Sequence, residues 1–238
     1  MATLTCALAR RQRASVMVLT LGLVGLAMPL AGQRGAGVVV AGKVSVLDKG
    51  NKQADDIGTT VIWLEGPSAP AAQPKAVQVL TEEKEFRPRI AVVTVGSTVT
   101  FPNNDPFNHN VFSLSPEGPF DLGLYARGQQ ASSTKLLKPG LIRVYCNIHP
   151  QMGAFIVVRD NPYFTQPGVD GSFQISGVRP GAYTLHAWHE RAAEVTKPVT
   201  VTSAGVTDAA IELDARGYTF KPHLNKLGQP YARGGVRY

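Results

Sequence analysis

Three side chains that bind soft metal ions recur at intervals of three in the segment "VYCNIHPQM": Cys146, His149 and Met152. An alternating apolar run precedes them, so Ile142, Val144 and Cys146 are expected to share one face of a strand. A proline directly after the histidine turns the chain. We therefore expect a tight loop between adjacent strands that brings a thiolate, an imidazole and a thioether to one point.

A further ligand is expected from "FPNNDPFNHNVFS", which supplies His109 after the strand "STVTF" and its turn. One cysteine, two histidines and a weakly bound methionine are the ligand set of mononuclear blue copper sites. The same ligand atoms can also bind zinc. The alternative without a metal is that the cysteine is a buried structural thiol. A catalytic cysteine is disfavoured, because that chemistry has no use for Met152.

The N-terminal segment indicates export. Three arginines (Arg10, Arg11 and Arg13) precede an apolar run over 14–30, which is the layout of a secretory signal, and we predict a signal peptide over 1–31. Cys6 lies before the apolar run and leaves with it. Cys146 is then the lone cysteine in an oxidising compartment, which implies an intermolecular disulfide, a reactive thiol or a metal ligand.

The charge argues against a nucleic-acid partner, and the hydropathy argues against a second membrane-spanning segment. The net charge of +7 includes the three arginines of the leader, and the mildly basic remainder is not a nucleic-acid signature. No second apolar run is long enough to cross a bilayer, so no membrane span is expected after removal of the signal. These features predict a periplasmic protein.

Short segments rich in Val, Ile, Thr and Tyr, bounded by Gly, Pro, Asn or Asp, predict an all-β chain of antiparallel sandwich strands. Composition breaks at 66–75 and at 159–171. We accordingly expect one small β-sandwich in two parts, an intervening domain and a tail. The predicted ranges are 36–66 and 160–214 for the small sandwich, 75–159 for the intervening domain and 215–238 for a basic C-terminal tail.

The segment "PGLIRVYCNIHPQM" resembles the copper loop of cupredoxins, the plastocyanin and amicyanin family, and the resemblance extends over 75–159. It implies a Greek-key β-sandwich that binds copper, cycling between Cu(I) and Cu(II). The ligands carried over by this resemblance are His109, Cys146, His149 and Met152. Asn110 matches the asparagine that ties the two ligand loops together beside the sulfur. Asn108 and Gln151 depart from the amicyanin pattern.

The outer segments resemble the two halves of a carboxypeptidase regulatory-like, transthyretin-type sandwich, which implies that the cupredoxin domain is inserted between them. Tandem modules or one extended sandwich are the alternatives. The whole arrangement is similar to exported bacterial proteins labelled methylamine utilisation or plastocyanin-like.

The resemblance implies a blue copper protein that carries single electrons, with a c-type cytochrome or a quinoprotein dehydrogenase as redox partner. Tyr145 and Asn147 flank Cys146 where copper oxidases and reductases have histidines, so the chain is not expected to be an enzyme. Copper storage or delivery is the first alternative. A noncatalytic sandwich with structural copper is the second.

Other residues receive smaller roles. Pro106, Phe107 and Pro150 are expected to form an apolar rim around an exposed His149. A strand places His186 and His189 on opposite faces, one packed and one solvated, so they are not expected to share a metal ion. His223 is given no metal role, and the tail is expected to pack on the body through Tyr218 and Phe220.

Overall fold

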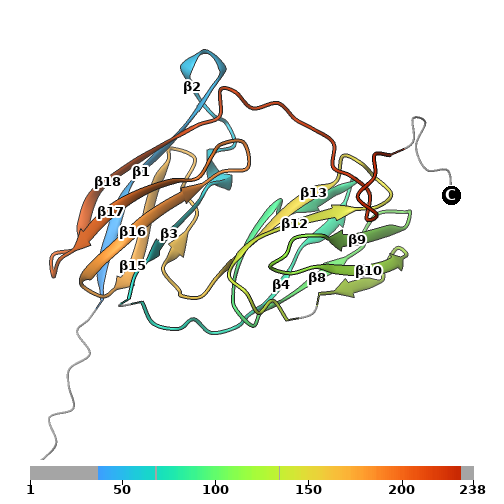
Figure 1. The fold of residues 1–238 in the computed structure, drawn as a ribbon, viewed down its shortest axis with the longest axis horizontal. Helices are drawn as coiled ribbons and strands as arrows, with labels where there is room; N and C mark the ends of the chain where they lie inside the picture. Colours follow the sequence, from blue (N-terminus) through green and yellow to red (C-terminus); the bar gives the residue numbers. More distant parts are fainter. Residues whose placement is uncertain (1–36, 68, 134, 232–238) are drawn as a thin grey trace, which may run out of the picture. The chain divides into compact units, whose positions relative to one another are not determined.

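The computed structural model describes residues 37–67, 69–133 and 135–231, and within them the chain consists of strands, turns and two short 3-10 helices. These helices are η1 (Lys49–Asn51) and η2 (Ile57–Thr59). The strands build two β-sandwiches (Figure 1), so the prediction of an all-β fold is confirmed. The predicted signal peptide lies outside the described residues. Within them, no helix has the length and hydropathy that a membrane crossing needs.

The first sandwich is made of strands from both ends of the described chain. One sheet has the order β15-β1-β18, with β2 paired to β1, and the other has the order β14-β3-β16-β17. The bounds are β1 (Val38–Asp48), β2 (Lys52–Gln53), β3 (Val61–Glu65), β14 (Phe164–Thr165), β15 (Ser172–Val178), β16 (Gly181–Trp188), β17 (Val195–Val201) and β18 (Val206–Asp214).

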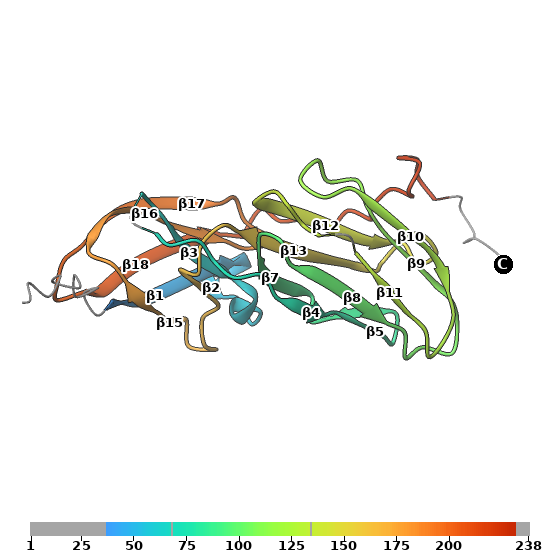
Figure 2. The same ribbon diagram turned by 90° about the horizontal axis from the view of Figure 1, so that it is seen from below.

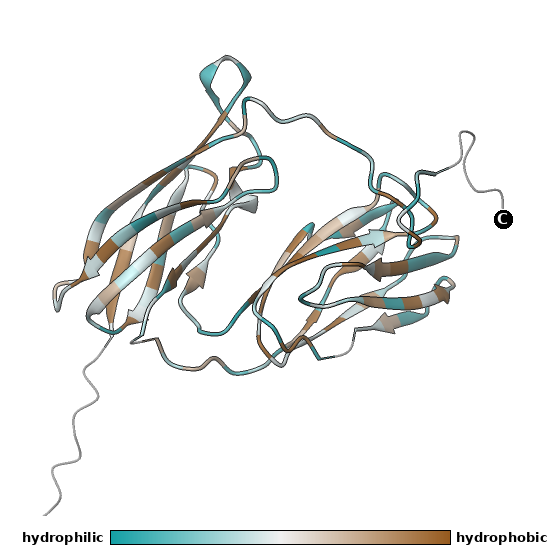
Figure 3. Ribbon diagram, viewed as in Figure 1, coloured by the Kyte–Doolittle hydropathy of each residue, from teal (hydrophilic) through white to brown (hydrophobic). Residues whose placement is uncertain are grey.

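Alternation of buried and more exposed side chains is clear in β16, whereas β3 is buried at four successive positions. In β16, Tyr183, Leu185 and Ala187 are buried while Thr184 and His186 between them are partly exposed. Side chains two apart in a strand share a face, so each sheet turns one apolar face inward. Figure 3 shows the resulting change of hydropathy along the strands. The two inward faces form one continuous apolar core.

The second sandwich comes from the middle of the chain. Its larger sheet has the order β10-β9-β12-β13-β7, a three-stranded sheet has the order β11-β8-β4, and β5 pairs with β6 (Figure 2). The bounds are β4 (Ala76–Gln78), β5 (Leu80–Glu82), β6 (Glu85–Arg87), β7 (Ile90–Thr94), β8 (Thr98–Pro102), β9 (His109–Ser113), β10 (Phe120–Tyr125), β11 (Gln130–Ser132), β12 (Gly140–Cys146) and β13 (Gly153–Arg159).

Strand β9 is buried at every position. It lies inside the larger sheet, with β10 on one side and β12 on the other. Alternation turns His109 and Val111 toward the core of the second sandwich, while Phe112 on the opposite face packs against Tyr145 and His223. Because both faces are covered, a polar side chain on this strand requires a polar or metal-binding partner.

A third apolar cluster involves strands of both sandwiches. It contains Val61 and Trp63 of β3, Ile90 of β7 and Val157 of β13, all at most 5% exposed. These residues occupy the faces of their strands that point away from the two main cores. Both sandwiches belong to one compact unit.

Substitution of a core leucine tests the packing of the first sandwich. Leu185 is fully buried, so Leu185→Ala is expected to lower the free energy of unfolding by about 2–5 kcal/mol, because it leaves a cavity. Both tryptophans, Trp63 and Trp188, lie in this sandwich, so urea titration followed by tryptophan fluorescence reports on it. Val169→Ala, at a residue 92% exposed, is the control and should change stability by less than about 0.5 kcal/mol. If Leu185→Ala and Val169→Ala changed the free energy of unfolding equally, this packing would be contradicted.

Candidate metal centre

The loop between β12 and β13 is closed by its own backbone. Cys146 is the last residue of β12, and its N–H donates to the carbonyl of Met152 (3.3 Å), directly before β13. Inside the loop, the N–H of Met152 donates to the carbonyl of His149 (2.9 Å). The sequence predicted a tight loop between adjacent strands at this point. The side chain of Cys146 continues the inward face of Ile142 and Val144, and all three residues are 0% exposed.

His109 reaches the same place from the neighbouring strand. It is the first residue of β9, is 0% exposed and shares the inward face with Val111. In the antiparallel pairing of β9 with β12, Cys146 lies opposite Val111. His109 and Cys146 are therefore close neighbours on one face of the sheet.

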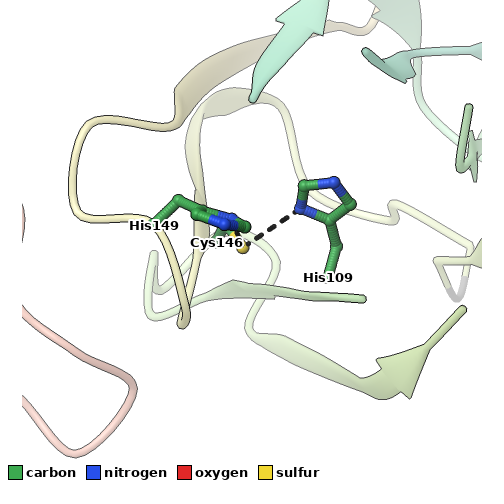
Figure 4. A group of neighbouring side chains, drawn as sticks. All are labelled: His109, Cys146 and His149. Atoms are coloured by element: carbon green, nitrogen blue, oxygen red, sulfur yellow. Dashed lines mark hydrogen bonds between the residues drawn. The ribbon is translucent and has the colours of Figure 1, made fainter. Parts of the chain in front are cut away.

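Three of the four residues predicted as ligands converge (Figure 4). The Cys146 sulfur lies 3.5 Å from Nδ1 of His109 and 3.6 Å from Nδ1 of His149, and the three ligand atoms lie within 4.8 Å of one another. Met152 is 1% exposed and belongs to the same apolar cluster as Cys146. In the described part of the chain, no other three His, Cys or acidic residues form such a group.

Burial sets the protonation states of these three groups. It raises the pKa of the Cys146 thiol, which is held in the apolar core. It lowers the pKa of His109, and it lowers the pKa of His149 to about 4, with the nearby His109 and Lys84 as smaller causes. Without a metal ion the thiol is protonated and both imidazoles are neutral at pH 7. A metal ion must therefore displace one proton, from the sulfur.

A residue that the sequence did not single out completes the surroundings of His109. Nε2 of His109 lies 2.9 Å from a carboxylate oxygen of Asp105, and both side chains are buried. Asp105 stands in the loop between β8 and β9, where residue spacing does not determine the direction of a side chain. Its position four residues before His109 was the only signal in the sequence.

Asn110 links the two ligand segments through its backbone. Its carbonyl accepts a hydrogen bond from the N–H of Asn147 (2.8 Å), and its N–H points at the Cys146 sulfur. The Asn110 side chain instead donates to the Asp121 carboxylate (2.7 Å) and to the carbonyl of Gly123 (2.9 Å). The tie expected from the resemblance is present, but the side chain of Asn110 is not the group that makes it.

An apolar hollow lies beside His149, which is half-buried. The ring of Phe107 is 5.2 Å from the His149 ring, and Pro106 lines the same hollow. Leu124, which is 57% exposed, and Ile148 complete it. Two of the three residues expected on this rim, Pro106 and Phe107, line the hollow, whereas Pro150 does not. Asn108, Leu124 and Ile148 line it as well and were not predicted to do so.

The C-terminal tail packs on the outer side of the ligand loop. The ring of His223 stacks on Tyr145 at 4.3 Å, the N–H of Lys226 donates to the Asn147 side chain (2.9 Å), and the Tyr231 hydroxyl donates to the carbonyl of Cys146 (3.1 Å).

The predicted tail contact is present for Tyr218, whose ring centre lies 6.0 Å from the guanidinium carbon of Arg191, and was wrong for Phe220, which is 47% exposed. Tail residues were hard to place from the sequence, since the segment carries no periodic pattern.

The two histidines of the first sandwich have separate hydrogen-bond partners. Nδ1 of His186 lies 2.6 Å from a Glu194 oxygen, and its ring stacks on Trp63. His189 is fully buried, and its Nε2 lies 3.1 Å from the Thr59 hydroxyl. The two rings are held by different partners. His186 is packed against an aromatic ring, so the prediction that one of the two is solvated was wrong.

One family model matches part of the chain. A family described as polysaccharide lyase family 4, domain II, matches residues 157–209, which run from the end of β13 into β18. No curated protein matches the sequence.

Several solved structures are similar to part of the chain. Amicyanin from Paracoccus versutus is 23% identical, with 35% of this chain and 81% of amicyanin covered and a TM-score of 0.32. A copper-containing nitrite reductase from Thermus scotoductus is 30% identical over 40% of this chain and 24% of its own, with a TM-score of 0.33. A purple cupredoxin from Nitrosopumilus maritimus is 23% identical over 34% of this chain and 98% of its own, with a TM-score of 0.31.

The stability of the metal-free protein should fall in acid. The pKa of His149 is about 4 in the folded state and near 6.5 in the unfolded state, so the unfolded chain binds the extra proton between these values. Lowering the pH from 6.5 to 4 should remove up to about 1.4 kcal/mol per pH unit through this group. Urea titrations followed by circular dichroism measure the slope. His149→Gln should make it shallower, and an unchanged slope would contradict the assignment.

Loss of the tail contact should loosen the ligand loop. Tyr231→Phe removes the hydrogen bond to the Cys146 carbonyl, which contributes about 1 kcal/mol, so amide hydrogen exchange in 147–152 should become about fivefold faster. Tyr218→Phe is the matched control and should leave that exchange unchanged. Equal exchange rates in the two variants would show that the tail does not restrain the loop.

Proposed function

We propose that this protein is a type 1, or blue, copper protein that acts in the periplasm and carries single electrons between redox partners. The observation that carries the proposal is the convergence of three ligand atoms, from His109, Cys146 and His149, within 4.8 Å of one another. Two of these residues stand on adjacent strands of one sheet, and the third lies in the loop that leaves one of them. The proposal is of an electron carrier and not of an enzyme.

The two distances from the sulfur to the histidine nitrogens fit one metal ion. Two donors bound at about 2.0–2.3 Å, with trigonal or tetrahedral angles, lie about 3.5 Å apart. The sulfur of Cys146 is 3.5 Å from His109 Nδ1 and 3.6 Å from His149 Nδ1. A thiolate with two imidazoles would suit copper, and the Met152 thioether would add a soft, weaker ligand that favours copper over zinc. Bound copper supplies the one-electron chemistry by cycling between Cu(II) and Cu(I).

The protein contributes ligands that are already close to their bound positions. His109 and Cys146 are fully buried on paired strands, and the loop that carries His149 is closed by hydrogen bonds at both of its ends. Both imidazoles are neutral at pH 7, so only the thiol has a proton to lose. Small movements of the ligands between oxidation states favour fast electron exchange.

His149 offers the route by which an electron reaches the site. Its ring contacts Phe107 in the apolar hollow, and Pro106 and Leu124 on the rim are exposed. An apolar surface with a redox ligand at its centre suits a small, transient interface with another redox protein. By the resemblance, that partner is a c-type cytochrome or a quinoprotein dehydrogenase.

Copper storage or delivery would use the same ligands. A carrier that hands over Cu(I) needs ligands that open readily. Here the sulfur of Cys146 is 0% exposed, and the tail is bonded to Asn147 and to the Cys146 carbonyl. These contacts favour retention of the metal and therefore electron transfer.

A visible absorption and electron paramagnetic resonance spectrum after addition of Cu(II) and removal of excess metal tests the proposal. An intense band near about 600 nm is expected from a thiolate bound to Cu(II), and Cys146→Ser should abolish it. Met152→Leu should retain the band while changing the reduction potential, because the axial ligand tunes that potential. His186→Gln, which changes a histidine of the first sandwich, should leave both unchanged.

Two outcomes would oppose the proposal. A colourless protein that retains no copper would show that these residues do not form a copper site. A blue protein that passes Cu(I) rapidly to an acceptor chelator, with slow or irreversible voltammetry, would favour delivery over electron transfer.

A further inference from the structure

Asp105 is a buried carboxylate in direct contact with a candidate ligand. Its side chain is 6% exposed and that of His109 is 0% exposed, and a carboxylate oxygen lies 2.9 Å from His109 Nε2. A buried charge is unfavourable unless it is paired or hydrogen-bonded. The groups that hold Asp105 therefore show whether it is charged and what it does to the histidine.

The turn between β5 and β6 supplies those groups. Glu83 and Lys84 have positive φ angles of 56° and 60°, the conformation of a type I′ hairpin turn. Their N–H groups donate to the two carboxylate oxygens of Asp105, at 2.7 and 3.1 Å. Successive N–H groups that converge in this way form an anion-binding nest. The N–H of Asp105 in turn donates to the Asn103 side chain (2.9 Å), which fixes the start of the loop.

These hydrogen bonds keep the carboxylate ionised. The N–H groups of Glu83 and Lys84 and Nε2 of His109 lie 2.7, 3.1 and 2.9 Å from the carboxylate oxygens, and hydrogen bonds to a carboxylate favour its charged form. A ring nitrogen that faces an acceptor-only carboxylate must carry a proton, so the proton of His109 is on Nε2.

This tautomer leaves the other ring nitrogen free for a metal ion. Nδ1 of His109 faces the Cys146 sulfur at 3.5 Å, and its lone pair is available when Nε2 carries the proton. When a carboxylate accepts a hydrogen bond from the N–H of an imidazole, the other ring nitrogen becomes a stronger metal ligand. His149 lies instead near the cation of Lys84, whose Nζ stands 5.2 Å from the centre of the Phe107 ring. The two candidate imidazole ligands are thus electrostatically unequal.

We propose that Asp105 is a positioning residue that orients His109, fixes its Nε2–H tautomer and biases the site toward Cu(II), so that it lowers the reduction potential. The inference rests on the proposed copper function. The negative charge lies behind the ligand nitrogen, so it stabilises the more highly charged oxidation state more strongly. The β5–β6 turn, which contributes no ligand, becomes part of the metal centre through this carboxylate.

Asp105→Asn tests the proposal, because it removes the charge while keeping the size of the side chain. We expect the variant to keep its blue band and to lose its preference for Cu(II) over Cu(I) by at least tenfold, which equals a rise of about 59 mV in potential for one electron. Voltammetry and competitive copper titration measure the change. Glu83→Gln is the matched control: it removes a charge from the adjacent turn, where the side chain is 71% exposed, but keeps the backbone N–H. The reduction potential of Glu83→Gln should shift much less than that of Asp105→Asn.

A second measurement needs no metal. Nitrogen NMR of the metal-free protein should find the His109 proton on Nε2 in the wild type and in Glu83→Gln, and a redistributed or rotated ring in Asp105→Asn. Equal potentials in the two variants, or a wild-type His109 protonated on Nδ1, would overturn the proposal. If Asp105→Asn does not fold, the tautomer of His109 in the wild type still tests the proposal. If the wild type binds no copper, the proposed function fails, while the tautomer separately tests the orienting role.

Discussion

The antiparallel pairing of β9 with β12 is the constraint on which the candidate centre depends. It sets Cys146 opposite Val111, so that His109 and Cys146 lie on the same inward face, and it continues into the loop as the bond from the Asn147 N–H to the Asn110 carbonyl. A slip of one residue would turn one of the two side chains to the other face of the sheet. The apolar residues of β9 and β12 pack into the core and oppose such a slip.

Burial determines the chemistry that this geometry permits. Removal from water keeps both imidazoles neutral and the thiol protonated, and it strengthens each remaining electrostatic contact. The charge of Asp105 is tolerated because the N–H groups of the β5–β6 turn and the ring of His109 surround it. A buried anion and a buried thiol thus face opposite nitrogens of one imidazole.

The ligand loop is supported from two directions. On one side, Phe107 packs against the His149 ring and leaves an apolar hollow open to solvent. On the other, the C-terminal tail bonds to Asn147 and to the carbonyl of Cys146. The loop therefore presents one ligand to the surface while its backbone is held by a segment from the far end of the chain. This arrangement suits a site that exchanges electrons without releasing its metal.

The sequence by itself determined the features that are local. Alternating side chains predicted the strands, and the spacing of Cys146, His149 and Met152 predicted a ligand loop, because neighbours in the chain remain neighbours in the fold. Tertiary structure alone decided the contact between Asp105 and His109, the nest at Glu83 and Lys84, and the place of the tail. The nest and the tail contacts join segments that are far apart in the sequence, and their geometry exists only once both sheets have packed. Asp105 is only four residues from His109, but it stands in a loop whose backbone direction follows no period.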